Sequence, residues 1–327
     1  MMMNRTWLWL FFLLICGGCL GGCWARENMT IKNTAQENVS MESVGTVFRT
    51  GMKWAPRPKS SSNFAVSPDG TRIIFGTGVI TDGLLLLDLK SGQKTRLPGE
   101  ENRFWEMGNW SHDGQQIVAV STAIRDNRYQ VGEQEIILID PKDWRHRKLA
   151  ATPGVNICPF FSADGKSVYY LKGEKRKRGR TLATNYDLYV YDLASDRETR
   201  LTHEKMYIAG DGYDDGSEVF FSAVGFERVR SIPSINASLS IYVLNKATLD
   251  VRLLDVDQSE GVFWLDFGGK DRTGNVYFKA TKKNRGFYRW FAYRCNAKGK
   301  DCAVLHEMLG QSRVRIARQT GEIFIDE

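Results

Sequence analysis

The chain of 327 residues is long enough to form one large domain or two of ordinary size. Its composition, 42% hydrophobic and 25% charged with a formal net charge of +7, is that of a folded protein and excludes disorder for most of the chain. The 31 glycines and the 12% of aromatic residues favour turns and strands.

The first 22 residues have the pattern of an export signal. Arg5 precedes an apolar run that soon breaks into glycine and cysteine, TWLWLFFLLICGGCLGGC. The run is short for a membrane span, since a spanning helix needs about 20 apolar residues. A basic start, a short apolar region and small residues after it are typical of a secretory signal peptide. We therefore predict a signal peptide over residues 1–22, and the alternative is an uncleaved membrane anchor.

The end of this segment carries a more specific signal. Residues 20–23, LGGC, resemble the bacterial lipobox, and the resemblance implies cleavage before Cys23 and lipidation of that residue. Cys19 fits the pattern less well. Trp24 stands where, in enteric bacteria, an Asp retains a lipoprotein at the inner membrane, so the resemblance implies the periplasmic face of the outer membrane.

A polar stretch without aromatic residues other than Trp24 follows, and it predicts a flexible tether over residues 23–44. After it, GTVFRTG at residues 45–51 has the pattern of a strand that could belong to the fold.

A turn motif between two short apolar runs then recurs along the rest of the chain. It is first seen in FAVSPDGTRIIFG and returns in GNWSHDGQQIVAV, PFFSADGKSVYYL, GDGYDDGSEVFFS, FGGKDRTGNVYFK and RIARQTGEIFIDE. The turn glycines are Gly70, Gly114, Gly165, Gly216, Gly274 and Gly321, at intervals of 44, 51, 51, 58 and 47 residues. Asp-Gly or Thr-Gly between apolar runs is a hairpin signal, because Gly adopts the positive φ that tight turns require. Such hairpins at a nearly constant interval indicate a repeat array.

The first four repeats each continue with two further strand-like segments, such as GLLLLDL and QKTRL in the first. Four strands in each unit of about 40 to 50 residues are typical of a propeller blade. The last repeat has only two strands before Glu327, so the ring needs a strand from the other end, and residues 45–51 are the best candidate. We predict an all-β fold over residues 45–327: a six-bladed β-propeller of four-stranded antiparallel blades, the last blade closed by an N-terminal strand. Five blades and a separate hairpin are the alternative.

These repeats resemble the TolB-like, or PD40, variety of WD40-like repeat. The resemblance rests on SPDGTRIIFGTG with LLLLDLKSGQKTRL, and on SADGKSVYYLKG with DLYVYDLASDRETRLT. It is good in the first three repeats and weak in the last two. It implies a protein-binding propeller, although TolB itself carries a further N-terminal domain where this chain has a lipid signal and a tether.

Three cysteines remain in the predicted propeller. Cys295 and Cys302 bracket the turn-like NAKGKD, so we expect them to face each other across a hairpin and form a disulfide in an extracytoplasmic compartment. A metal site is the alternative, although no His lies near them with ligand spacing. Cys158, between Ile157 and Pro159, is expected to be a buried small hydrophobic residue.

The sequence contains few of the patterns that are typical of an enzyme. It has no Gly-x-Ser-x-Gly elbow, no metal-binding spacing and no cofactor motif, so we expect no catalysis, no metal and no cofactor. The turn carboxylates Asp69, Asp113, Asp164 and Asp215 are expected to cap their own backbone. His112 is expected to be a solvated turn residue. An envelope polysaccharide lyase or hydrolase remains the alternative, and a basic residue beside a His in the central channel would be its signal.

Long insertions fall on the propeller face opposite the Asp-Gly turns, where loops on a rigid scaffold commonly bind ligands. Two of them, KGEKRKRGRTLATNY and SAVGFERVRSIPSINAS, are basic. The candidate partner-binding residues in them are Lys175, Arg176, Lys177, Arg178, Arg180, Arg228 and Arg230.

Basic clusters of this kind attract acidic partners, although they can also be solvated loops. The export signal argues against nucleic acid, so we expect an envelope protein or an anionic envelope polymer. The favoured interpretation is a lipid-anchored, non-catalytic binding or scaffolding propeller of the cell envelope.

Overall fold

The computed structural model describes residues 52–55, 63–76, 83–149, 154–178, 181–206, 208–224, 239–256, 262–284, 287–308 and 313–326. The predicted signal peptide, the tether and the strand expected at residues 45–51 lie outside these residues. The described part of the chain contains no helix that is long and apolar enough to cross a membrane.

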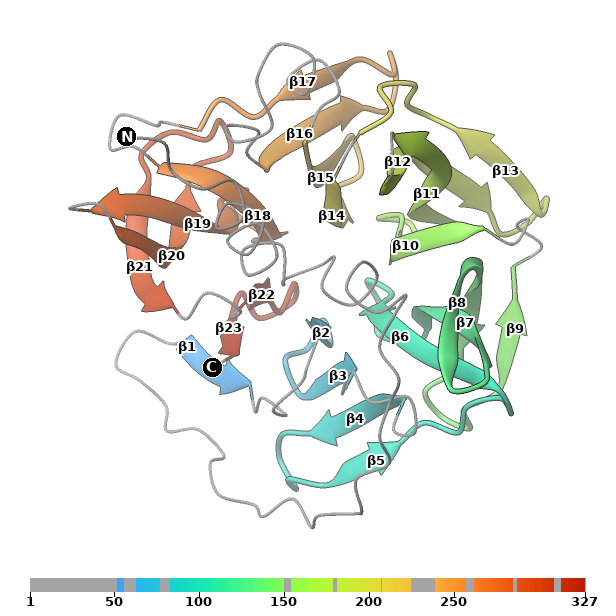
Figure 1. Cartoon of the computed structure of the whole chain (residues 1–327). Helices are drawn as coiled ribbons and strands as arrows, with labels where there is room; N and C mark the ends of the chain where they lie inside the picture. Colours follow the sequence, from blue (N-terminus) through green and yellow to red (C-terminus); the bar gives the residue numbers. More distant parts are fainter. Residues whose placement is uncertain are drawn as a thin grey trace, which may run out of the picture.

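Five antiparallel sheets of four strands each radiate from a central axis as propeller blades (Figure 1). Within each blade the strands are hydrogen-bonded in chain order from the axis outwards. Blade 1 is β2 (Asn63–Val66), β3 (Arg72–Gly76), β4 (Leu84–Asp88) and β5 (Lys94–Arg96). Blade 2 is β6 (Arg103–Trp110), β7 (Ile117–Arg125), β8 (Arg128–Ile139) and β9 (His146–Lys148). Blade 3 is β10 (Val155–Phe161), β11 (Ser167–Arg178), β12 (Thr181–Asp192) and β13 (Arg197–Arg200).

Blade 4 is β14 (Ile208–Asp214), β15 (Glu218–Val224), β16 (Ser240–Asn245) and β17 (Val251–Leu253). Blade 5 is β18 (Val262–Lys270), β19 (Val276–Asn284), β20 (Phe287–Cys295) and β21 (Ala303–Met308). The prediction of an all-β propeller built from four-stranded antiparallel blades is confirmed.

The sixth sheet joins the two ends of the described chain. Its three described strands are β22 (Val314–Ile316), β23 (Ile323–Asp326) and β1 (Met52–Ala55), in the order β1-β23-β22. Strand β1 runs parallel to β23, with Met52 opposite Ile323, whereas β22 and β23 are antiparallel. An N-terminal strand therefore covers the outer edge of β23. Its parallel pairing differs from blades 1 to 5, in which all neighbouring strands are antiparallel.

The repeated turns are held by side chains that bond to their own backbone. In blade 3, Ser162 Oγ donates to Asp164 at 2.6 Å, and it accepts the Ser167 amide at 2.9 Å. Asp164 also accepts the Lys166 amide at 3.1 Å, and Gly165 has a φ of +72°. The Ser162 hydroxyl and then the Lys166 amide hold the pKa of Asp164 below its ordinary value. The turns of blades 1 and 2 repeat these bonds around Asp69 and Asp113, and Asp215 accepts two amides of its own turn, so the capping role predicted for all four carboxylates is confirmed.

Neighbouring blades pack closely around the axis. An added Cβ on Gly212 of β14 would lie 2.2 Å from the ring of Phe160 in β10. One on Gly268 of β18 would lie 2.7 Å from the Val314 carbonyl oxygen in β22. Only glycine fits at these contacts, because real Cβ atoms do not approach other atoms so closely.

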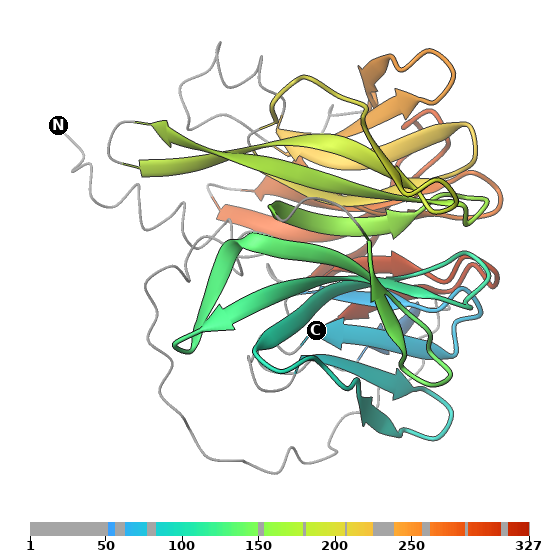
Figure 2. The same cartoon turned by 90° about the vertical axis from the view of Figure 1, so that its right-hand side faces the viewer.

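The propeller has two different ends, seen from the side in Figure 2. At one end, the turn face, the Asp-Gly turns and the turns between third and fourth strands lie together. At the other end, the hairpin face, the second and third strands of each blade are joined. The hairpins β7–β8 and β11–β12 project furthest on the hairpin face (Figure 2).

Candidate functional site

The predicted basic loop of blade 3 is a strand hairpin rather than a loop. Residues 175–178 continue β11, and the register pairs Lys175 with Thr184 and Arg178 with Thr181 on β12. Each strand of this hairpin has 12 residues. The four residues opposite 175–178 in the register, Thr181 to Thr184, are uncharged.

The other basic residues of the two predicted insertions fall into two groups. Lys172, at the base of the same hairpin, is paired with Glu198 at 2.7 Å and so has a structural partner. Arg180, Arg228 and Arg230 lie outside the described residues, as does the predicted lipidation site Cys23. The described part of the proposed binding face is thus the β11–β12 hairpin.

Cys295 and Cys302 are joined by a disulfide, with 4.1 Å between their Cα atoms. Cys295 ends β20 and Cys302 precedes β21, so the bridge closes the turn between the two outer strands of blade 5. Cys158 is buried, as expected, and is not part of a disulfide. Across the residues that the structure describes, no group of three or more His, Cys, Asp or Glu side chains gathers where it could hold a metal ion.

A central channel, with a cavity of about 90 Å³, is lined by residues of the inner strands and of the first turns. Inner strands β6, β10, β14 and β18 each contain a bulge, and the stretch that follows each bulge contributes to the lining. In three of them the bulge has a non-glycine residue at positive φ, namely Met107, Cys158 and Trp264. The ionisable residues of the lining are His112, Asp211, Tyr213, Lys270, Arg315 and Arg318.

Within the channel, Asp211 on β14 is shared by Arg315 of β22 and by Arg313, which directly precedes that strand. Arg313 Nη1 lies 3.0 Å from Asp211 Oδ2, and Arg315 Nη2 contacts the same oxygen. Arg315 also donates from Nε to the Phe64 carbonyl oxygen at 3.0 Å and from Nη1 to the Val314 carbonyl oxygen at 2.8 Å. This cluster ties β14 and β22 to blade 1 across the axis, which is a structural role.

His112 is not the solvated turn residue that we expected. It is half-buried in the channel wall, where Nδ1 lies 3.1 Å from the Ala163 carbonyl oxygen and the ring meets the Arg318 guanidinium. Burial and then the charge of Arg318 lower the pKa of His112 from 6.5 to about 4. The prediction failed because the side chain at this position of the turn points towards the axis of the propeller. The turn motif alone does not reveal this direction.

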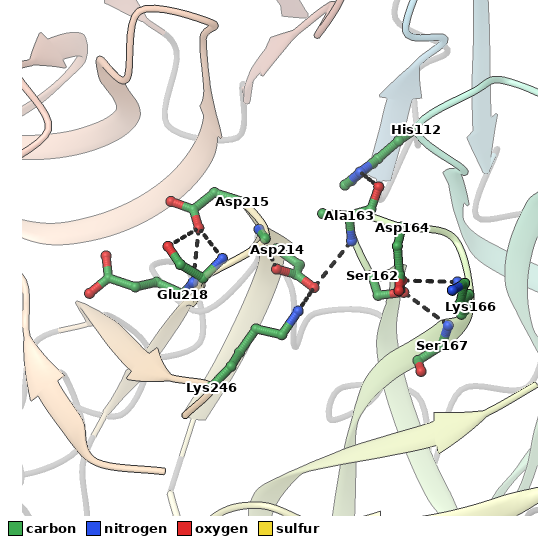
Figure 3. A network of polar contacts seen from close by, with 12 residues as sticks. His112, Ser162, Ala163, Asp164, Lys166, Ser167, Asp214, Asp215, Glu218 and Lys246 are labelled. Atoms are coloured by element: carbon green, nitrogen blue, oxygen red, sulfur yellow. Dashed lines mark hydrogen bonds and ion pairs between the residues drawn. The ribbon is translucent and has the colours of Figure 1, made fainter. Parts of the chain in front are cut away.

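An ion pair between the buried carboxylate of Asp214 and the partly exposed Lys246 continues this chain of contacts into blade 4 (Figure 3). Asp214 Oδ2 accepts the Ala163 amide at 3.1 Å and lies 2.8 Å from Lys246 Nζ, and its side chain is fully buried. Asp214 Oδ1 accepts the Gly216 amide at 2.7 Å. The polar contacts from His112 through Ala163 to Lys246 therefore link blades 2, 3 and 4 at the turn face.

Sequence reasoning did not find Asp211, Asp214, Arg315 or Arg318. One signal could have found the last of these. Pro68, His112, Ala163 and Arg318 occupy the same position of the repeated turn, directly after the residue whose amide closes it. Equivalent positions of a propeller repeat converge on the axis, so a charged residue at such a position is a candidate channel residue.

No family model matches the chain, and no curated protein matches it by sequence. Among solved structures, it is similar to a protein assigned as TolB from Agrobacterium tumefaciens, with 18% identity, a TM-score of 0.55, and coverage of 80% of this chain and 88% of that one. TolB from Acinetobacter baumannii matches with 16% identity and a TM-score of 0.52 over 81% of this chain and 57% of that one. An oligogalacturonate lyase from Vibrio parahaemolyticus matches with 12% identity and a TM-score of 0.51 over 76% of this chain and 68% of that one. The fold of this chain is thus the β-propeller that it shares with TolB proteins.

Proposed function

We propose that this chain is a lipid-anchored propeller of the cell envelope that binds a protein or an anionic envelope polymer and catalyses no reaction. The observation that carries the proposal is the β11–β12 hairpin, which projects on the hairpin face and has Lys175, Arg176, Lys177 and Arg178 in consecutive positions. A basic projection on a rigid scaffold suits the capture of an acidic surface, because its field acts over several ångströms of solvent.

The anchor is the second part of the proposal. Signal peptidase cleavage before Cys23 and acylation of that residue would leave residues 23–44 as a tether between the membrane and the propeller. We place the protein at the periplasmic face of the outer membrane. We also propose that the sixth sheet is a complete blade of the ring, closed by the N-terminal segment that precedes β2, with Arg180, Arg228 and Arg230 adding to the basic hairpin face.

The anchor is tested by fractionation of native cells that express either the wild type or Cys23→Ser. The wild type should sediment with outer membranes and carry a lipid-modified N-terminus, and the variant should lose both properties. The lipid anchor would be contradicted if Cys23→Ser stays membrane-bound and the N-terminus is unmodified in both the wild type and the variant.

The second candidate function is an envelope polysaccharide lyase or hydrolase with its site in the channel. It is favoured by one observation, the contact of His112 with Arg318 in the channel wall. Its weakness is the pKa of about 4 for His112, which makes the imidazole a poor proton acceptor at neutral pH. Incubation with purified envelope polysaccharides, followed by chain-length analysis, separates the two functions: cleavage that is lost in His112→Gln would favour the enzyme.

A further inference from the structure

Arg318 differs from the other cations of the channel in the protein partners of its N–H donors. Its Nη1 contacts both ring nitrogens of the His112 imidazole and lies 3.4 Å from the Asp214 carbonyl oxygen. Its guanidinium carbon lies 4.9 Å from the centre of the Tyr213 ring. Within the described part of the chain, no carboxylate pairs with Arg318, and its Nε and Nη2 have no hydrogen-bond partner.

The two neighbouring cations show what a structural role looks like in the same channel. Arg315 uses Nε, Nη1 and Nη2 on the Phe64 carbonyl, the Val314 carbonyl and Asp211. Lys270 is paired with Asp215 at 2.5 Å. Among the described residues, one edge of the Arg318 guanidinium has no protein partner, and this is the kind of edge that binds a carboxylate or phosphate through two parallel hydrogen bonds.

His112 and Tyr213 hold this edge in place. The Ala163 carbonyl oxygen can only accept, so Nδ1 of His112 carries the ring proton, and Arg318 Nη1 lies against both ring nitrogens. A neutral imidazole therefore orients the guanidinium without neutralising its charge. The guanidinium of Arg318 lies over the Tyr213 ring, and this contact also holds its orientation.

We propose that Arg318 anchors a binding site for a small oxyanion, a carboxylate or phosphate group, at the turn-face end of the central channel. Four observations carry the proposal: the unpaired guanidinium edge, its two orienting side chains, its place in the channel lining, and a lining with three permanent cations against one carboxylate. The cavity of about 90 Å³ has room for a few waters or for one small anionic group. The site lies at the end of the propeller opposite the proposed partner-binding hairpin, so the two can be tested separately.

The test is a titration of the full-length, detergent-extracted protein with sodium phosphate and, separately, with sodium acetate, at constant ionic strength set by sodium chloride. Binding is followed as the rise of Tm with anion concentration, because a ligand of the folded state stabilises it by mass action. The wild type should show a saturable rise with at least one of the anions. A response to phosphate alone indicates a phosphate-bearing ligand, and a response to acetate alone indicates a carboxylate.

Arg318→Gln should raise the apparent Kd about tenfold or more, because it removes a charged, bidentate donor. The apparent Kd of Arg318→Lys should lie between those of the wild type and Arg318→Gln, since lysine keeps the charge but cannot donate two parallel hydrogen bonds. Arg252→Gln, which removes an exposed cation on β17, is the matched control and should bind as the wild type does. The proposal is overturned if Arg318→Gln, folded by circular dichroism, binds within twofold of the wild type, or if the wild type binds neither anion.

Discussion

Arg318 lies against the imidazole of His112, although 206 residues separate the two in the chain. The contact joins the turn of the sixth sheet to the turn of blade 2 across the mouth of the channel. Burial and then the charge of Arg318 lower the pKa of the histidine and keep it neutral at pH 7 in the folded protein, and this neutrality has a measurable consequence for stability.

Stability should fall with acidification through His112. Its pKa in the folded protein is about 4, below the ordinary 6.5, so below pH 6.5 the unfolded chain takes up a proton that the folded chain refuses. The free energy of unfolding should therefore drop as the pH falls from 6.5 towards 4. Between pH 7 and pH 4.5 the wild type should lose about 2 kcal/mol more than His112→Gln, measured by urea unfolding. Parallel pH profiles of the two proteins would refute the assignment.

The buried carboxylate of Asp214 should be costly to remove. Asp214→Ala leaves Lys246 and the Ala163 and Gly216 amides without their acceptor, so unfolding should become easier by about 3 to 5 kcal/mol. Arg252→Ala breaks an exposed pair with Glu218 and should cost less than about 1 kcal/mol. Equal losses in the two variants, measured as urea midpoints at pH 7, would show that the Asp214 network is not a structural link.

Glycine at position 212 should be needed for blade packing. Gly212→Ala forces a Cβ against the Phe160 ring and should cost about 1 to 3 kcal/mol of stability, or more if the blades cannot separate. In Gly99→Ala the new Cβ would have its nearest neighbour at 3.8 Å, so this control should change stability by less than about 1 kcal/mol. A double-mutant cycle with Phe160→Val should show strong coupling, and additive effects would argue against the contact.

The Cys295–Cys302 bridge should stabilise blade 5. It closes a short loop, for which the chain-entropy description gives about 2 to 3 kcal/mol. Cys295→Ala/Cys302→Ala should lower the free energy of unfolding by this amount, and dithiothreitol should lower that of the wild type equally. Dithiothreitol should leave the stability of the double variant unchanged, and an effect there would point to another disulfide.

The repeat pattern predicted the blades because each blade buries its strands against neighbours and so keeps an apolar signature. Val168 to Leu171 of β11 are all buried, and the Ser-x-Asp-Gly turn before them is a strong local signal. The far half of the same hairpin, GEKRKRGRTLAT, has no apolar alternation. In this half of the hairpin β11 and β12 are paired through their backbones, and without a hydrophobic pattern the sequence predicts a loop.

The channel was harder to predict because its residues come together only when the ring closes. His112, Asp214 and Arg318 belong to different blades, and each sits in a turn or strand end that is unremarkable by itself. The direction in which such a side chain points depends on inner-strand bulges such as the one at Cys158, where φ is positive on a non-glycine residue. Local propensity contains no information on these contacts.

The central claim, a binding propeller that captures its partner on the hairpin face, is tested most directly by quantitative crosslinking capture from native envelopes. The variant Arg176→Glu/Arg178→Glu reverses charge on β11, and Arg145→Glu/Arg147→Glu, on the turn face, reverses the same number of charges as a control. We predict that one envelope protein or anionic polymer is enriched by the wild type and by the control variant and is lost with the β11 variant. Equal capture by all three proteins, or no enrichment by the wild type, would contradict the account.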